Sequence, residues 1–305
     1  MKKIFYRNLR DKKLQTIEQF RVGSWIHIEE PSEQDLIELC DVFHLDEGLL
    51  ADALDIYEVP RMEVEDGIVY IFTRYPFKKK DQVSTNPLLF VIAKEVFITI
   101  TREKFFLLDN FLERYDFYTT QKNKLLLHHF RLIDNAYNTY FHTISRQIRS
   151  SAYELEKITN KDIIQFVNYE RVLNDFHLAL VRMNAVLNSL TGHHIIKFYE
   201  EDKELIEDLF LSNDQLIQLS KENLRSIVNI RDAYTTIMTN NTNRVIRFFT
   251  SITVILTIPM IVTSMYGMNV GLPFAQSPWA FTGLMLFTLV ITGALVLVFL
   301  INDWL

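Results

Sequence analysis

Charged residues are almost missing from the last part of the chain. The 305-residue sequence holds 38 Asp+Glu and 32 Lys+Arg, yet residues 233–302 contain no acid and only two bases, Arg244 and Arg247. Two uncharged runs result, Phe248–Met265 and Ala280–Ile301. Because about 20 apolar residues span the hydrocarbon core of a bilayer, both runs predict transmembrane helices. The alternative is a buried hairpin in a soluble core, but two such runs in tandem are rare in soluble folds.

Positive charge is also absent from the segment that connects the two runs. Arg244 and Arg247 flank the first run on its N-terminal side, and basic residues mark the cytoplasmic ends of membrane spans. We therefore expect residues 1–243 and the short tail after the second run to lie in the cytoplasm. No apolar stretch follows the charged start MKKIFYRNLRDKKLQ, so no signal peptide is expected.

Cysteine is reduced to one residue, Cys40, which excludes an internal disulfide and agrees with a reducing compartment. Its neighbours, LIELCDVFHL, have amphipathic helical spacing, so we expect Cys40 in the core rather than as a nucleophile. The net charge of the chain is −6, and the part before the apolar runs is the acidic one. This balance disfavours nucleic acid as a partner and weakly favours cations, although a solvated surface explains it equally well.

Glycine and proline are absent from two long stretches, Leu88–Thr191 and residues 193–258. Beyond its first strands, the first stretch repeats an apolar 3–4 spacing that predicts long packed helices. The second stretch predicts one uninterrupted helix that continues into the membrane and, at 1.5 Å per residue, is about 100 Å long. A globule needs no helix of that length, so we interpret it as a stalk.

Turn-forming residues and short β-type segments fill the region before these stretches. GSWIHIEEP and DGIVYIFTRYPF predict strands, and LLFVIAKEVFITIT predicts a hairpin or a pair of strands. PSEQDLIELCDVF predicts a helix with Ser32 as N-cap and Asp35 three residues later. Alternating strands and helices predict a small α/β domain.

The predicted fold class is an α+β membrane protein. An N-terminal α/β cytoplasmic domain is followed by a long stalk helix that continues into the first of two C-terminal transmembrane helices. The predicted segments are an α/β domain (1–120), a cytoplasmic helical hairpin (121–192), the stalk helix (193–247), the first span (248–266), an extracytoplasmic loop (267–279), the second span (280–301) and a cytoplasmic tail (302–305).

One face of the long helix carries regularly spaced polar residues. Steps of four and three residues from Gln218 define a polar stripe: Gln218, Glu222, Arg225, Asn229, Asp232, Thr236, Thr239, Asn243, Ile246, Thr250, Thr253, Thr257, Met260 and Ser264. This spacing keeps one seam of a helix facing a common axis in a bundle. Of the six Ser and Thr residues in the first span, only Ser251 and Thr263 fall outside the stripe.

Two interpretations of the stripe remain open. Hydroxyls in a membrane helix can bond back to the helix backbone or to a neighbouring helix. Alternatively, identical helices surround an axis and line a narrow wettable pore, with Ile246 as a candidate hydrophobic gate. One hairpin cannot enclose a pore, so this interpretation requires a homo-oligomer. The pore-lining candidates are then Asn243, Ile246, Thr250, Thr253, Thr257, Met260 and Ser264.

The stripe leads into Gly267, Met268 and Asn269 of the sequence SMYGMNVGLPF. We expect Gly267 to let the backbone turn out of the helix and Asn269 to stand at the external mouth. A ring of neutral amide oxygens suits a divalent ion that keeps its water, and Mg²⁺ dehydrates reluctantly. Neutral ligands also release the ion easily, as conduction requires. A turn asparagine beside a glycine is the alternative.

These features resemble the CorA family of magnesium transporters. The Tyr266-Gly267-Met268-Asn269 signature, at the end of the first of two C-terminal spans, carries the resemblance together with NNTNRV at residues 240–245. WIHIEEPSEQDLIELCDVF, LLADALDIYEVPRMEV and LLFVIAKEVFITITRE are similar to the N-terminal segments of the family. The resemblance therefore covers nearly the whole chain.

The resemblance implies a homopentamer in the cell membrane that conducts hydrated Mg²⁺ passively, with Asn269 contacting the ion. It also implies closure by cytoplasmic Mg²⁺ bound between cytoplasmic domains. By position, Asp52 and Asp208 correspond to acidic residues of that regulatory site, with ordinary surface carboxylates as the alternative. Two departures concern gating: the loop VGLPFAQSPW has no acid, and the end INDWL lacks a lysine cluster.

Other functions compete with Mg²⁺ transport. Within the family the alternatives are Co²⁺, Ni²⁺ and Zn²⁺, with Zn²⁺ disfavoured because the stripe inside the membrane offers no His, Cys or carboxylate. From another class, the alternative is a membrane-anchored cytoplasmic sensor or scaffold. That alternative predicts no preference for hydroxyls on one helix face.

The sequence contains no motif for catalysis or for energy coupling. No phosphate-binding loop or nucleophile–base constellation is present, so we expect no enzymatic activity and no organic cofactor. Neither span contains an ionisable residue that could relay protons, so the membrane potential is the expected driving force. The pairs His128–His129 and His193–His194 are expected to be surface or packing residues, because neighbours on a helix point in different directions.

Overall fold

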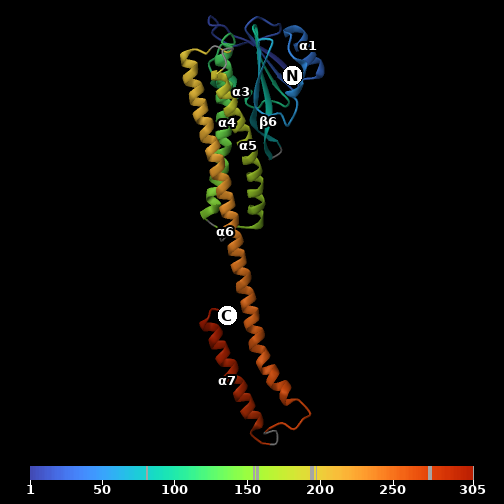
Figure 1. Ribbon diagram of the computed structural model, residues 1–305, viewed down its shortest axis with the longest axis vertical. Coiled ribbons are helices and arrows are strands. Elements are labelled where there is room, and N and C mark those ends of the chain that lie inside the picture. Colours follow the sequence, from blue (N-terminus) through green and yellow to red (C-terminus); the bar gives the residue numbers. More distant parts are fainter. Residues whose placement is uncertain are drawn as a thin grey trace. The chain divides into compact units, whose positions relative to one another are not determined.

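The computed structural model describes residues 1–79, 82–153, 155, 158–192, 196, 198–273 and 277–304. The chain divides into two compact units, residues 1–230 and 231–305, and helix α6 contributes to both (Figure 1). The elements are β1 (Lys2–Tyr6), β2 (Gln15–Ile17), β3 (Ser24–Glu29), α1 (Glu33–Phe43), α2 (Glu47–Asp52), β4 (Arg61–Glu65), β5 (Ile68–Lys79), β6 (Gln82–Ile92), β7 (Val96–Thr101), α3 (Leu108–Arg114), α4 (Lys122–Tyr153), α5 (Asn160–Gly192), α6 (Glu200–Tyr266) and α7 (Ala280–Ile301).

A seven-stranded sheet forms the middle of the first unit, in the order β2-β1-β3-β7-β6-β5-β4. Strands β3 and β7 pair in parallel, with Ser24 opposite Val96. The other described neighbours are antiparallel. The predicted strands β3 and β5 and the predicted β6–β7 pair are confirmed.

Both faces of this sheet are buried. Successive residues of a strand point to opposite sides, so each strand contributes side chains to both faces. Trp25 and Phe90 belong to one hydrophobic core, and Ile26 and Leu89 belong to the other. Helices α1 and α2 cover the second core, whereas α3, α4, α5 and the first part of α6 cover the first. The first unit therefore has three layers, with the sheet between two layers of helices.

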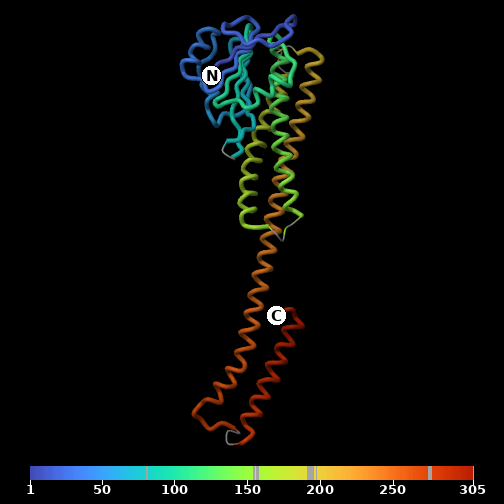
Figure 2. Tube along the Cα trace, turned by 180° about the vertical axis from the view of Figure 1, so that it is seen from behind, coloured from blue at the N-terminus to red at the C-terminus, as the bar shows by residue number. Residues whose placement is uncertain are grey.

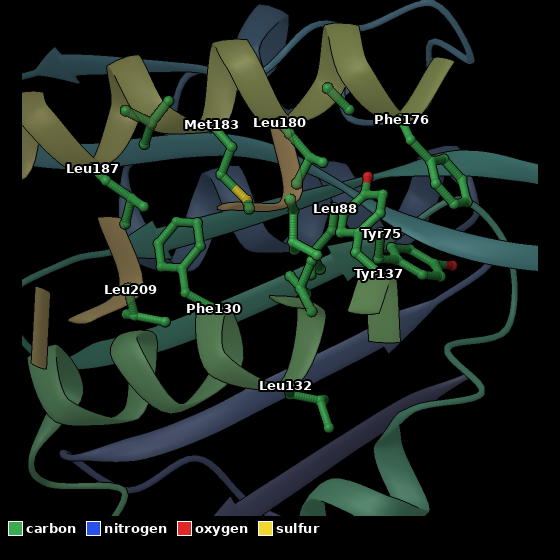
Figure 3. Close-up of a cluster of buried hydrophobic side chains, with 14 of the residues drawn as sticks. Tyr75, Leu88, Phe130, Leu132, Tyr137, Phe176, Leu180, Met183, Leu187 and Leu209 are labelled. Carbon is green, nitrogen blue, oxygen red and sulfur yellow. The ribbon is translucent and has the colours of Figure 1, made fainter. Parts of the chain in front are cut away.

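The larger core joins the sheet to the long helices. Figure 3 shows Phe130 of α4 beside Met183 of α5, and Tyr137 of α4 packs against Phe176 of α5 with ring centroids 4.9 Å apart. Leu209, on the first part of α6, belongs to the same core. Residues 1–120 and 121–192, which we predicted as separate segments, thus share one core within the first unit.

Helix α1 has the start that the sequence predicts. The Ser32 hydroxyl accepts a hydrogen bond from the Asp35 backbone N–H at 3.2 Å, and the Asp35 carboxylate accepts one from the Ser32 N–H at 2.8 Å. This reciprocal pair is a capping box, which satisfies backbone donors that a helix start leaves free. Cys40, which we expected in the core, lies half-buried on the same helix and packs against the second core from its edge.

Helix α6 is continuous from Glu200 to Tyr266, so the predicted stalk that continues into the first span is confirmed. Its start is later than the predicted residue 193. The Asp202 carboxylate accepts a hydrogen bond from the Tyr199 N–H at 3.1 Å, which caps the first turn. Pro259 lies inside the helix without ending it.

The second unit is a helical hairpin. Figures 1 and 2 show α7 running back along the last part of α6. Both helices are long and apolar enough to cross a membrane. Among the described residues of this unit, Ser251 alone is buried, so the hairpin leaves its apolar side chains exposed or half-buried.

Candidate functional site

The polar stripe lies on the uncovered side of α6. Every stripe residue from Gln218 to Ser264 is exposed. Off the stripe, the buried Ser251 hydroxyl donates a hydrogen bond to the Arg247 carbonyl at 2.9 Å, and its oxygen lies 3.4 Å from the carbonyl oxygen of Trp304, just after α7. Thr263 lines a groove together with α7 residues. The end of α7 therefore buries Ser251 and leaves the stripe open, whereas Thr263 is exposed at the flank of α6.

The stripe hydroxyls are fixed by their own helix. Thr250, Thr253 and Thr257 donate to the carbonyls four residues earlier at 2.8, 2.8 and 2.7 Å. A hydroxyl has one hydrogen and two lone pairs. Because the hydrogen is used in the helix, each oxygen remains available only as an acceptor on the exposed side. Back-bonding and a pore-facing role are thus compatible, since the first prepares a row of acceptors for the second.

The Gly-Met-Asn segment follows the end of α6 directly. The Gly267 N–H donates to the Thr263 carbonyl at 3.0 Å, and Met268 and Asn269 are exposed. The φ angle of Gly267 is not in the left-handed region, and a Cβ atom there would lie 3.4 Å from the Thr263 carbonyl oxygen, an ordinary contact. We expected Gly267 to let the backbone turn out of the helix. Within a single chain, however, the conformation at this position does not require a glycine.

At the other end of the hairpin, the stripe residues are Asn243, which borders a polar groove, and Ile246, which does not line it. Ile246 is 55 % exposed. Asn243 lies on the stripe but also lines a groove with Arg244, Arg247 and Asp303. Asn243 therefore stands at the edge between the stripe and the α7 side of the helix.

Asp52 is held by an arginine that the sequence analysis did not single out. Arg61 Nη2 donates to the Asp52 carboxylate at 2.7 Å, and the Asp52 side chain is 46 % exposed. Arg61 also pairs with Glu58 and Glu63. Three carboxylates thus share one guanidinium, and the cluster keeps a net negative charge. No spacing rule connects Arg61 to Asp52 in the sequence, because the loop between α2 and β4 brings them together.

Asp208 is exposed on α6. In the described part of the chain, no hydrogen bond or ion pair joins it to Asp52, and no group of three His, Cys, Asp or Glu side chains is arranged to hold a metal ion. A single chain therefore does not assemble the predicted regulatory site.

The first histidine pair is a packing feature, as expected. His129 is 1 % exposed, and its ring lies 4.1 Å from that of Phe111 and 5.0 Å from that of Trp25. Its Nδ1 atom lies 2.8 Å from the Leu125 carbonyl oxygen. Burial lowers the pKa of His129 to about 3, so the ring is neutral at physiological pH. The pair His193–His194 lies outside the described residues.

The family described as CorA-like Mg²⁺ transporter protein matches residues 21–300. The chain belongs to this family. A relative from Methanocaldococcus jannaschii, the cobalt/magnesium transport protein CorA, is 24 % identical over 92 % of this chain and 90 % of its own length. The complete structure of the CorA magnesium transporter from that organism matches with a TM-score of 0.89 and 22 % identity, covering 100 % of this chain and 99 % of that one.

A further comparison supports the fold of the first part of this CorA-family chain. The ZntB cytoplasmic domain from Vibrio parahaemolyticus matches with a TM-score of 0.63 and 9 % identity, over 78 % of this chain and 98 % of that one. The predicted fold class of the CorA-family chain is confirmed, with its soluble α/β domain, long helix and final apolar helix. Family membership makes the protein a divalent cation transporter.

Proposed function

We propose that the protein conducts hydrated Mg²⁺ passively into the cytoplasm through a pore formed by several copies of α6. The resemblance of the Gly-Met-Asn signature implies five copies. The name of the M. jannaschii relative includes cobalt, so Co²⁺ is the second candidate ion. In the proposed orientation, in the cell membrane, residues 1–243 and the tail after α7 lie in the cytoplasm, because Arg244 and Arg247 flank only that end of the hairpin.

The observation that carries the proposal is the exposure of the whole polar stripe opposite the helix that packs on α6. Exposed hydroxyls gain nothing from facing lipid, and α7 does not cover them. Copies of α6 around an axis would instead turn Thr250, Thr253, Thr257 and Ser264 toward water. The residues nearest the cytoplasm on this face, Asn243 and Ile246, would frame the inner end of the pore, with Ile246 as its hydrophobic constriction.

Hydrated Mg²⁺ matches the chemistry of this surface. The waters of the ion's first shell point their hydrogens outward, and Mg²⁺ keeps several of them. The stripe hydroxyls offer only lone pairs on their exposed side, so they accept hydrogen bonds from the shell without replacing it. The Asn269 amide oxygen would do the same at the external mouth. Neutral acceptors hold the ion weakly enough to release it.

The membrane potential is a sufficient driving force in this proposal. Moving one elementary charge across 100 mV is worth about 2.3 kcal/mol, and a divalent ion gains roughly twice that. Regulation would follow from Mg²⁺ bound between copies at Asp52 and Asp208. The acid excess around Arg61 favours a cation there, and the exposure of Asp208 leaves it free to meet another copy.

Ion uptake into liposomes tests the proposal. The variant Asn269→Ala removes one acceptor per copy, and each hydrogen bond to a charged shell is worth about 1.5–3 kcal/mol, so we expect Mg²⁺ uptake to fall about tenfold or more. Ser251→Ala, which removes a hydroxyl buried on the α7 side, is the matched control and should leave uptake nearly unchanged. Normal uptake by Asn269→Ala, or an equal loss in Ser251→Ala, would contradict the proposed pathway. Repeating the measurement with Co²⁺ ranks the two ions.

A further inference from the structure

A groove at the Arg244 end of the hairpin shares only Asn243 with the proposed conduction pathway. It lies between α6 and the residues after α7, and its polar lining consists of Asn240, Asn243, Arg244, Arg247 and Asp303. Its volume is about 900 Å³, at the upper end of the range of about 300–1,000 Å³ that small-ligand pockets occupy.

The groove opens away from the proposed pore axis. Arg244, Arg247 and Ser251 follow one another at helical spacing of three and four residues, so they share one face of α6. Ser251 on that face is buried against the residues after α7. The two arginines therefore lie on the α7 side, and an arrangement that turns the stripe toward an axis leaves them at the outside of the hairpin.

The positive charge of the groove is not neutralised by direct pairing. In the part of the chain that the structure describes, neither guanidinium makes an ion pair or a side-chain hydrogen bond, although Asp303 lines the same groove. Two arginines and one aspartate leave a net single positive charge. Arginine presents a fork of N–H donors that matches the oxygens of a phosphate group.

An apolar lining continues the groove beside the charged one. Val245, Phe248, Phe249 and Trp304 complete its wall, and Phe248 and Phe249 are 44 % and 62 % exposed. The Trp304 indole stacks on Phe299 with ring centroids 5.7 Å apart. Tryptophan at the end of a span marks the level of the lipid headgroups. The groove thus offers cationic donors and apolar rings side by side at that level.

The backbone after α7 supports a built groove. The Trp304 N–H donates to the Phe299 carbonyl at 2.9 Å, which closes the helix in the pattern that usually places glycine before it. Here the position before Trp304 is Asp303, with a φ angle of 54°. A non-glycine residue in this region is disfavoured, yet its conformation turns the chain back so that Trp304 reaches Ser251.

We propose that this groove binds the headgroup of an anionic phospholipid, with Arg244 and Arg247 on the phosphate and the aromatic rings against the glycerol and the first part of the acyl chains. Basic pockets between membrane helices attract such headgroups, and each arginine near a membrane surface contributes about fivefold in affinity. The net single charge of this groove then gives about a fivefold preference for an anionic over a zwitterionic lipid.

Tryptophan quenching by brominated lipids tests the site in the full-length protein. In a Trp279→Phe background two tryptophans remain, and Trp25 is 0 % exposed in the core of the first unit, so contact quenching reports on Trp304. We expect brominated phosphatidylglycerol to quench at about fivefold lower mole fraction than brominated phosphatidylcholine. Arg244→Gln with Arg247→Gln should abolish this preference. Asp303→Asn, which keeps a side chain that tolerates the same backbone conformation, should raise it by about fivefold.

The two changes are expected to shift the preference for anionic lipid in opposite directions. This difference distinguishes a lipid site from a purely structural contact between the arginines and Asp303. If the arginines served only to hold Asp303, both changes would loosen the same contact and act in the same direction, which would overturn the proposal. Equal quenching by the two lipids in the parent protein would also overturn it. A third result would overturn it as well: loss of the preference for phosphatidylglycerol in inorganic phosphate but not in chloride of equal ionic strength. Free phosphate would then be the ligand. None of these readouts depends on ion uptake.

Discussion

The two units differ in how they treat apolar side chains: residues 1–230 bury them within the unit, whereas residues 231–305 do not. The first unit places its apolar side chains in two cores on the two faces of one sheet, and Trp25, Ile71 and Phe90 are at most 1 % exposed. In the described part of the second unit, Ser251 alone is buried. The first unit therefore carries its own stability, whereas the second depends on what surrounds it: lipid for the apolar faces and, in our proposal, water for the stripe.

The comparison predicts its largest stability effect at Trp25. Its indole N–H donates to the Thr99 hydroxyl at 2.9 Å, and it packs against Phe5 and Phe111. We expect Trp25→Ala to lower the free energy of unfolding of the first unit by about 3–5 kcal/mol. Thr257→Val, on the exposed stripe, should change it by less than about 0.5 kcal/mol. Urea denaturation followed by circular dichroism measures both, and similar losses would break the comparison.

A second effect concerns pH and again separates the buried core from the surface. The pKa of His129 is about 3 in the folded protein, below its ordinary value near 6.5, because burial disfavours the charged ring. The unfolded chain thus binds a proton that the folded chain does not, so stability falls as pH drops below about 6.5. Between pH 7 and pH 5 this amounts to about 2 kcal/mol. Burial also lowers the pKa of His27, with the same sign.

Asp134 opposes this trend, since burial raises its pKa to about 6 and its protonation favours the folded state as pH falls. The contribution of His129 is therefore isolated by comparing variants. We expect His129→Gln to reduce the loss of stability between pH 7 and pH 5, measured by urea denaturation at each pH. His142→Gln, which changes an exposed ring on the same helix, is the control. An unchanged slope in His129→Gln would contradict the assignment.

We expect the smallest stability effects at the surface acids, so their role is tested by protection from protease rather than by stability. Asp52→Asn with Asp208→Asn should leave folding nearly unchanged but weaken the protection from protease that cytoplasmic-side Mg²⁺ gives. We expect about a tenfold higher Mg²⁺ concentration for half protection, because two charged ligands are lost. Asp41→Asn with Asp214→Asn changes two other exposed acids on α1 and α6 and serves as control. Equal protection in both double variants would remove Asp52 and Asp208 from the regulatory proposal.

Local chemistry was sufficient to predict the features that depend on a few neighbouring residues. The capping box of Ser32 and Asp35, the β6–β7 pair, the continuity of α6 and the two apolar helices all follow from short-range rules, and the structure confirms them. The separation of stripe hydroxyls from Ser251 and Thr263 was also visible as a spacing, because helical periodicity fixes which residues share a face.

Features that depend on contacts between distant segments were not predicted. Strand β1 lies in the charged start of the chain, where the lysines hide the alternation of Ile4 and Phe5 between the two cores. The parallel pairing of β3 with β7 joins segments about 70 residues apart, and no local signal encodes it. The pairing of Arg61 with Asp52 depends in the same way on a loop conformation. The later start of α6 follows from the Asp202 cap, which residue composition alone did not reveal.

Cysteine accessibility tests the central claim most directly, that the exposed edge of α6 faces a shared water-filled axis. The single native thiol makes the design simple: Thr257→Cys and Ser251→Cys are each placed in a Cys40→Ser background and treated in liposomes with a charged methanethiosulfonate reagent. We predict that Thr257→Cys reacts and loses Mg²⁺ uptake, while Ser251→Cys, buried on the α7 side, does neither. An unreactive Thr257→Cys, or a modified one that still conducts, would contradict the account.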